Sequence, residues 1–112
     1  MDVKGGLQLL VDELVEADVK ADLDNSKLNP PCAWVHPGPI IARTLGDGYT
    51  MTAQVTLIAP NTSNVGNLDA LSQLLTKALT KLEPDGPIET DAVVTIAGKN
   101  LPAFTFPIDV DL

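Results

Sequence analysis

The chain has 112 residues, a length that suits one hydrophobic core, and 45% of them are apolar, which argues against disorder. Fifteen acidic residues face seven basic ones, for a formal charge of −8, and the basic residues are scattered, which argues against binding DNA or RNA through phosphates. A single cysteine excludes an intramolecular disulfide, and no apolar run approaches the ~20 residues of a membrane span.

The first predicted element is an amphipathic helix of about 15 residues close to the N-terminus. Its apolar residues recur at three- and four-residue spacing, and acidic residues fill the opposite side. A helix of this length is not stable alone in water, so its apolar stripe must pack against a sheet. The apolar positions are Leu7, Leu10, Val11, Leu14 and Val15.

Two short strands are predicted next, over residues 19–23 and 32–36, where apolar and polar side chains alternate. Between them, residues 24–26 indicate a turn, and the two prolines at 30–31 require extended backbone. The Pro-Gly-Pro sequence at 37–39 ends the second strand.

A hairpin is predicted around Gly46–Gly48, with strands over residues 40–45 and 49–58. Its second strand is long, about ten residues, so we expect it to lie centrally or to extend beyond its neighbours. A two-residue loop at Asp47-Gly48 would create one largely apolar face. The pairs expected on it are Ile40 with Val55, Ala42 with Ala53 and Thr44 with Met51.

A second amphipathic helix and a closing hairpin complete the predicted elements. Leucines at helical spacing mark the helix from Leu68 onward, with Asn67 as its N-cap. In the hairpin, Gly98–Asn100 would form a three-residue turn. That turn would place Val94 beside Phe104 and Ala92 beside Phe106.

These elements predict a single α+β domain over residues 1–112. We expect a twisted, mainly antiparallel sheet of about five to six strands, with two amphipathic helices packed on one face. The other face, rich in threonine and short side chains, would be free for partners. Trp34 is either a partly buried core aromatic or an interface anchor. The candidate interface residues are Trp34, His36, Arg43, Thr50, Thr52 and Gln54.

Residues for catalysis or metal binding are not predicted. The only histidine, His36, and the only cysteine, Cys32, lie four residues apart on one strand, about 13 Å at the usual rise, too far for a hydrogen-bonded pair. One Cys and one His cannot build a tetrahedral zinc site. Asp22 and Asp24 lack the rest of a calcium-binding loop. We therefore predict neither an enzyme nor a cofactor.

One stretch resembles a known family. An amphipathic helix followed by Leu28-Asn29-Pro30-Pro31-Cys32 and an apolar strand is similar to the tail terminator (tail completion) proteins of long-tailed bacteriophages of actinobacteria. The long alternating strand, Asn-rich loop, Leu-rich helix and closing hairpin that follow are similar in outline.

The resemblance implies a virion structural protein that forms a ring, expected to be a hexamer, and caps the finished tail tube at its head-proximal end. The expected partners are other copies of the chain, the tail tube protein and the head–tail connector proteins. DNA would pass through the lumen without specific binding. Residues Met1–Gly6 lack the apolar stretch of a signal peptide, which favours assembly in the host cytoplasm.

Two other functions stay open on the sequence. One is a head-completion or connector protein of similar size. The other is a small ligand-binding or regulatory α+β domain whose threonine-rich sheet face binds a molecule.

Overall fold

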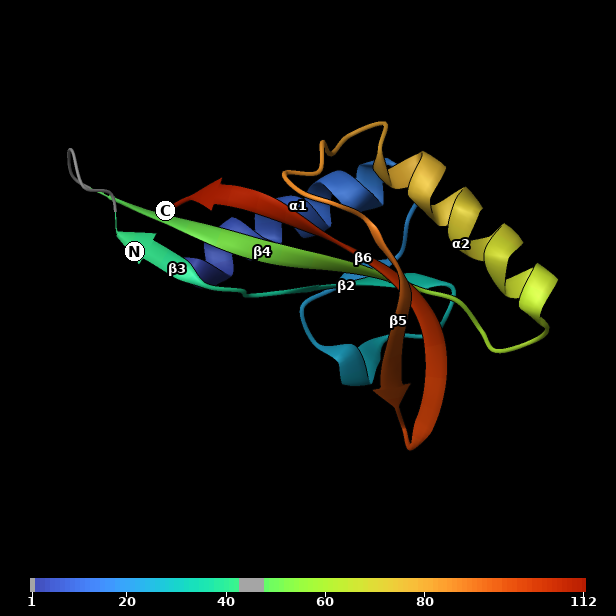
Figure 1. The fold of residues 1–112 in the computed structure, drawn as a ribbon. Helices are drawn as coiled ribbons and strands as arrows, with labels where there is room; N and C mark the ends of the chain where they lie inside the picture. The colour runs from blue at the N-terminus through green and yellow to red at the C-terminus, as the bar shows by residue number, and fades with distance from the viewer. Residues whose placement is uncertain (1, 43–47) are drawn as a thin grey trace.

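The computed structural model describes residues 2–42 and 48–112, which form two α helices and six strands (Figure 1). The strands form one sheet in the order β1-β2-β4-β6-β5, with β3 beside β4. Every pairing is antiparallel except that of β1 with β2. This confirms the predicted α+β fold. The elements are α1 (Val3–Glu16), β1 (Ala21–Asp22), the 3₁₀ turn η1 (Asn25–Lys27), β2 (Cys32–His36), β3 (Ile40–Ala42), β4 (Tyr49–Ile58), α2 (Asn64–Ala78), β5 (Glu89–Ile96) and β6 (Lys99–Asp111).

Helix α1 begins at an Asp2 cap, whose carboxylate accepts a hydrogen bond from the Gly5 amide at 2.9 Å. Its buried residues match the predicted stripe except at Val15, which is 56% exposed. Val15 is rotated by about 100° from its neighbour Leu14 around the helix axis. Because Leu14 points directly into the core, Val15 leaves the contact with the sheet.

Helix α2 begins earlier than predicted, because its cap is Ser63 and not Asn67. The Ser63 hydroxyl accepts a hydrogen bond from the Gly66 amide at 3.0 Å. Asn67 is buried inside the helix, where its side-chain oxygen accepts from the Thr62 amide at 3.0 Å. Asn67 therefore fastens the preceding loop to the helix instead of starting the helix.

The main core fills the space between the two helices and the sheet. Along β4, Met51, Val55 and Leu57 face the helices and are fully buried, as the alternation predicted. Phe104 and Phe106 of β6 join them. The long strand β4 lies centrally, between β2 and β3 on one side and β6 on the other.

The pairing of β3 with β4 differs from the predicted hairpin. Ile40 pairs with Met51 rather than with Val55, because the place beside Val55 is taken by Val35 of β2. The expected pair of Ala42 with Ala53 is also wrong, because Ala42 pairs with Tyr49. The third expected pair, Thr44 with Met51, includes Thr44, which lies outside the described residues.

The Pro-Gly-Pro break at residues 37–39 accounts for this register, since it divides one sheet edge into β2 and β3. His36 pairs with Gln54, and the next pair is Ile40 with Met51. From one pair to the next, the chain moves four residues along β2 and β3 but only three residues along β4. This is a one-residue bulge. The prolines have no amide hydrogen for the ladder, and a side chain on the glycine between them would collide with the β4 backbone.

The closing hairpin also has a register that differs from the prediction. Its turn consists of Ala97 and Gly98, not of a three-residue loop at Gly98–Asn100, and both have positive φ, 53° and 78°. Positive φ at both positions is the signature of a type I′ turn, whose twist matches that of the strands. Val94 therefore pairs with Leu101 and not with Phe104.

This register creates a second apolar cluster on the face opposite the helices. Ala92 pairs with Ala103, not Phe106. This odd shift reverses the faces of β5, so Ala92, Val94 and Ile96 point away from the helices. The prediction that this whole face is free is therefore wrong at the β5 end. The second cluster has buried residues Cys32, Ile58, Leu101 and Ala103, against which Leu28, Trp34, Ala92, Val94 and Ile96 pack.

The molecule is elongated, with extents of 49 × 27 × 24 Å. Its narrow end consists of β3, the start of β4 and the end of β6, and we call it the arm (Figure 1, left). Here the sheet is reduced to three strands, and the C-terminal Leu112 donates its amide hydrogen to the Tyr49 carbonyl at 2.9 Å.

Candidate functional site

The candidate interface residues that the structure describes lie on one face of the sheet, opposite the helices. Trp34 and His36 come from β2, and Thr50, Thr52 and Gln54 from β4. The cross-strand pair His36 with Gln54 brings the two groups together. Arg43 lies outside the described residues. We call the part of this face that the second cluster does not occupy the open face.

Trp34 lies at the border between the second cluster and the open face. Its indole Nε1 donates a hydrogen bond to the Leu23 carbonyl at 3.1 Å, which fastens the loop after β1 to the sheet. Its ring stacks on His36, with ring centroids 4.0 Å apart and planes inclined by 21°. Trp34 is half-buried, so the predicted core role is present, and its remaining surface faces outward beside His36.

A row of polar groups crosses three strands behind this stack. His36 Nε2 lies 3.0 Å from the Thr56 hydroxyl, which lies 3.1 Å from the Thr105 hydroxyl. Thr56 is only 4% exposed, so both contacts satisfy a hydroxyl that water barely reaches. Burial lowers the pKa of His36, which keeps its imidazole neutral at pH 7.

Toward the arm, the open face is lined by threonine–aspartate pairs between β4 and β6. Thr52 donates to Asp109 at 3.0 Å and Thr50 to Asp111 at 3.4 Å. Strands β2 and β4, and residues 103–111 of β6, contain no Lys or Arg. The open face is therefore neutral to acidic.

Sequence reasoning missed Thr105, Asp109 and Asp111 as members of this face. Their signal was the two-residue spacing along the last strand, which puts all three on one side. The hairpin register expected from the sequence was wrong for β5, although Phe104 and Phe106 of the last strand were placed on the apolar face correctly. Only the pairing with β4 brings Asp109 to Thr52, 57 residues away in the chain.

Cys32 is fully buried in the second cluster, where burial raises the pKa of its thiol to about 11. The thiol is thus protonated at neutral pH and behaves as a small apolar side chain. Asp22 and Asp24 accept local hydrogen bonds: Asp22 from the Asp24 amide, and Asp24 from Ser26. The side-chain and backbone hydrogen bonds from Ser26 lower the pKa of Asp24. The described residues contain no group of three or more His, Cys, Asp or Glu that could hold a metal ion.

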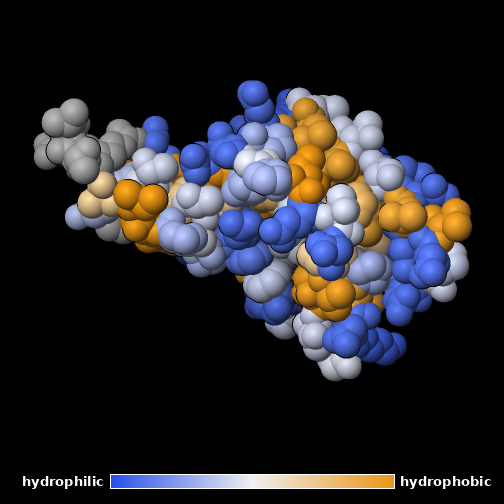
Figure 2. Space-filling view, in the orientation of Figure 1, coloured by the Kyte–Doolittle hydropathy of each residue, from blue (hydrophilic) through white to orange (hydrophobic). Residues whose placement is uncertain are grey.

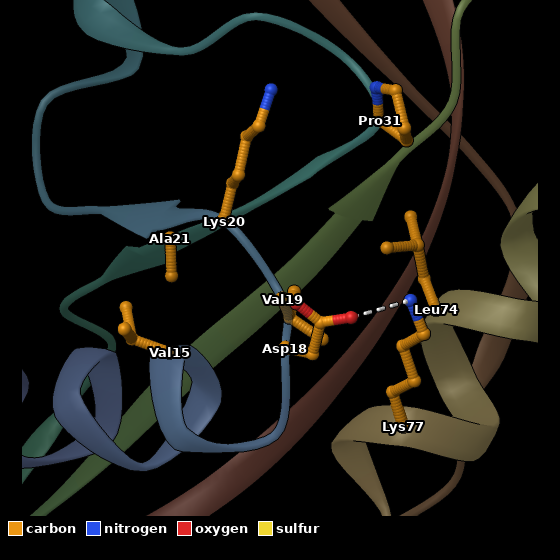
Figure 3. A pocket seen from close by; sticks show the side chains of 8 residues that line it. All are labelled: Val15, Asp18, Val19, Lys20, Ala21, Pro31, Leu74 and Lys77. Atoms are coloured by element: carbon orange, nitrogen blue, oxygen red, sulfur yellow. Dashed lines mark hydrogen bonds and ion pairs between the residues drawn. The ribbon is translucent and has the colours of Figure 1, made fainter.

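A hollow of about 450 Å³ lies elsewhere, between the end of α1, β1 and α2 (Figure 3). Lys77 of α2 reaches across it to Asp18, with Nζ and Oδ2 3.4 Å apart. A second ion pair, Lys81 with Glu16 at 3.6 Å, lies nearby and joins the end of α1 to the turn after α2. Lys77 and Asp18 therefore tie α2 to the segment after α1, and the hollow does not adjoin the open face.

No known protein family, curated protein or solved structure matches the chain. Among the described residues, neither helix is long and apolar enough to cross a membrane.

Proposed function

We propose that this chain is a bacteriophage tail terminator, a structural subunit that assembles into a ring, caps the tail tube and joins it to the head–tail connector. The observation that carries the proposal is the arm. Among the described residues β3 pairs only with β4, so its outer edge is open. Ile41 is 64% exposed, and Ile40 and Tyr49 beside it are about two-fifths exposed.

An open strand edge with apolar side chains favours pairing with another chain. Figure 2 shows this hydrophobic surface over β3, at the left of the molecule beside the grey residues. A contact between the arm and a different surface of the next copy is heterologous, and such contacts close into rings when the rotation allows. This supports a ring, and a hexamer is the expected form.

The charge supports the same proposal. A ring that conducts DNA benefits from walls that do not grip phosphate, and the chain carries a formal charge of −8. The open face offers a second contact surface, with Trp34, His36, Thr50, Thr52 and Gln54 toward the tube or connector proteins. Assembly would take place in the host cytoplasm, and the finished ring would belong to the virion.

The test compares Ile41→Asp with Leu9→Asp, a matched control because Leu9 on α1 is also 64% exposed. Light scattering should find a ring of about six subunits, or a monomer that becomes a ring on tail tubes. Ile41→Asp should abolish the ring and Leu9→Asp should preserve it. Electron microscopy should then show tails of uncontrolled length, or unjoined to heads, when only the Ile41 variant is supplied.

A wild-type chain that stays monomeric with and without tail tubes, and that leaves tail length and head joining unchanged, would contradict the proposal. If both variants form rings equally well, the arm is not part of the contact between subunits.

A further inference from the structure

Strand β5 forms a second open edge, on the opposite side of the sheet from the arm. Among the described residues β5 pairs only with β6, so no strand of the same chain lies along its outer side. Its register is irregular between Glu89 and Ala92 and regular from there to Ile96, after which the turn begins. The regular part of this edge is therefore residues 92–96.

The open edges of β3 and β5 are both apolar on both faces of the sheet. On β3, Ile40 points to the helix side and Ile41 to the opposite face, and they are 42% and 64% exposed. On β5, Val93 points to the helix side and is 63% exposed, whereas Val94 packs on the second cluster. Edges that stay unpaired are usually protected by charges or proline, and residues 40–42 and 92–96 contain neither.

The strand directions decide how two such edges can meet. Strand β3 is antiparallel to β4, β4 to β6, and β6 to β5, so β3 and β5 of one chain run in opposite directions. A second copy set beside the first in the same orientation therefore brings its β3 antiparallel to the first copy's β5. The helices of both copies then lie on the same side of one sheet. This contact is heterologous and repeats from copy to copy.

We propose that β3 of one copy pairs antiparallel with β5 of the next copy, so that one sheet continues from subunit to subunit. The inference rests on the ring of the proposed function, and it names the surface that the arm contacts. Strand addition at an open edge supplies backbone hydrogen bonds, while side chains on both faces supply specificity. Neither edge carries a charge that would repel the other.

The faces of the two strands select one register. Paired side chains share a face, so Ile41 must lie opposite Ala92, Val94 or Ile96, which point away from the helices. Opposite Ala92, the ladder would run into the irregular segment, and opposite Ile96 it would run into the turn at Ala97. Val94 alone leaves all of β3 beside regular backbone. The expected pairs are Ile40 with Thr95, Ile41 with Val94 and Ala42 with Val93.

Disulfide cross-linking tests this register in the full chain, alone and on tail tubes. A double variant with Ile41→Cys and Val94→Cys places two thiols opposite each other on one face, within reach of a disulfide. After mild oxidation, a non-reducing gel should show a ladder of linked copies that ends at the size of the ring. The matched control combines Ile41→Cys with Val93→Cys, whose thiol lies on the other face, and should give at least about tenfold less product. The native Cys32 is fully buried and stays in place.

Val93→Asp tests the β5 edge without a cysteine. Because Val93 is exposed, the variant should fold as the wild type does by circular dichroism, yet it should lose the ring as Ile41→Asp does. Rings that survive Val93→Asp, or that give no more cross-linked product than the control, would overturn this pairing and leave the proposed function intact. Linked dimers from Ile41→Cys alone would mean that β3 pairs with β3, which also overturns it.

The tail assay separates the pairing from the proposed function. A full ladder of linked copies from a chain that leaves tail length and head joining unchanged would support the pairing and contradict the terminator role. A chain that stays monomeric in every condition and forms no cross-link would overturn both.

Discussion

On the helix face of the sheet, every residue of β4 that points toward the helices between Met51 and Leu57 is fully buried, whereas the opposite face changes along the same strand. Ile58 belongs to the second cluster, Thr56 is buried with hydrogen-bond partners, and Thr52 is half-exposed beside an aspartate. The two faces of β4 differ in burial because different elements cover them. The helices cover one face of β4 from Met51 to Leu57, and the loop that carries Leu28 covers only one end of the other face.

The comparison shows how one alternating strand serves two environments. A covered position needs an apolar side chain or a fully bonded polar one, because an unpaired buried polar group is costly. An uncovered position tolerates threonine and aspartate, and these remain available to a partner. The border at Thr56 marks where a structural surface becomes a candidate binding surface.

The strongest way to test the comparison is to damage the larger core. Phe106→Ala removes the largest fully buried side chain, and we expect the free energy of unfolding to fall by about 3–5 kcal/mol. Urea denaturation followed by circular dichroism measures the loss. A loss below about 1 kcal/mol would mean that the helices do not pack on β6 as described.

The second cluster should contribute less to the free energy of unfolding than the main core, but by a measurable amount. Leu101→Ala removes a buried side chain from it, and we expect a loss of about 2 kcal/mol, near the lower end for such substitutions because the cluster is small. The control is Val93→Ala on the exposed side of β5, which should change stability by less than about 0.5 kcal/mol. Equal, negligible losses in both variants would refute a packed second cluster.

The smallest expected effect is a change in the pH dependence of stability, which reports whether water is excluded from the second cluster. Burial raises the Cys32 pKa from 9.0 to about 11, so on raising the pH the unfolded chain loses its thiol proton before the folded chain does. This contribution to stability is fully present below pH 9 and is lost as the pH approaches 11. Compared with Cys32→Ala, the wild type should lose about 1 kcal/mol more by pH 10.

Parallel denaturation curves at pH 8 and pH 10 give this difference, because groups common to both proteins cancel. A thiol reagent at pH 8 should react slowly with the folded chain and quickly in denaturant. Identical pH dependence of the two proteins, together with fast labelling of the folded chain, would show that the cluster is open to water.

Local patterns in the sequence were enough to predict the helices, the central strand and its two faces. The spacing of Leu7, Leu10 and Leu14 needs no knowledge of the partner surface, because helix geometry alone puts them on one side. The alternation along β4 is likewise local, and for this reason Thr50, Thr52 and Gln54 were assigned to one face correctly.

Tertiary structure decided the registers, and through them the candidate site. Val55 could pair with Ile40 as far as local pattern goes, but Val35 of β2 competes for the same place, and that competition involves residues far apart in the chain. Ala97 at a positive φ carried no local signal, since glycine and asparagine are the usual residues there. The sequence by itself thus determined which residues form each face, whereas long-range pairing decided which faces meet.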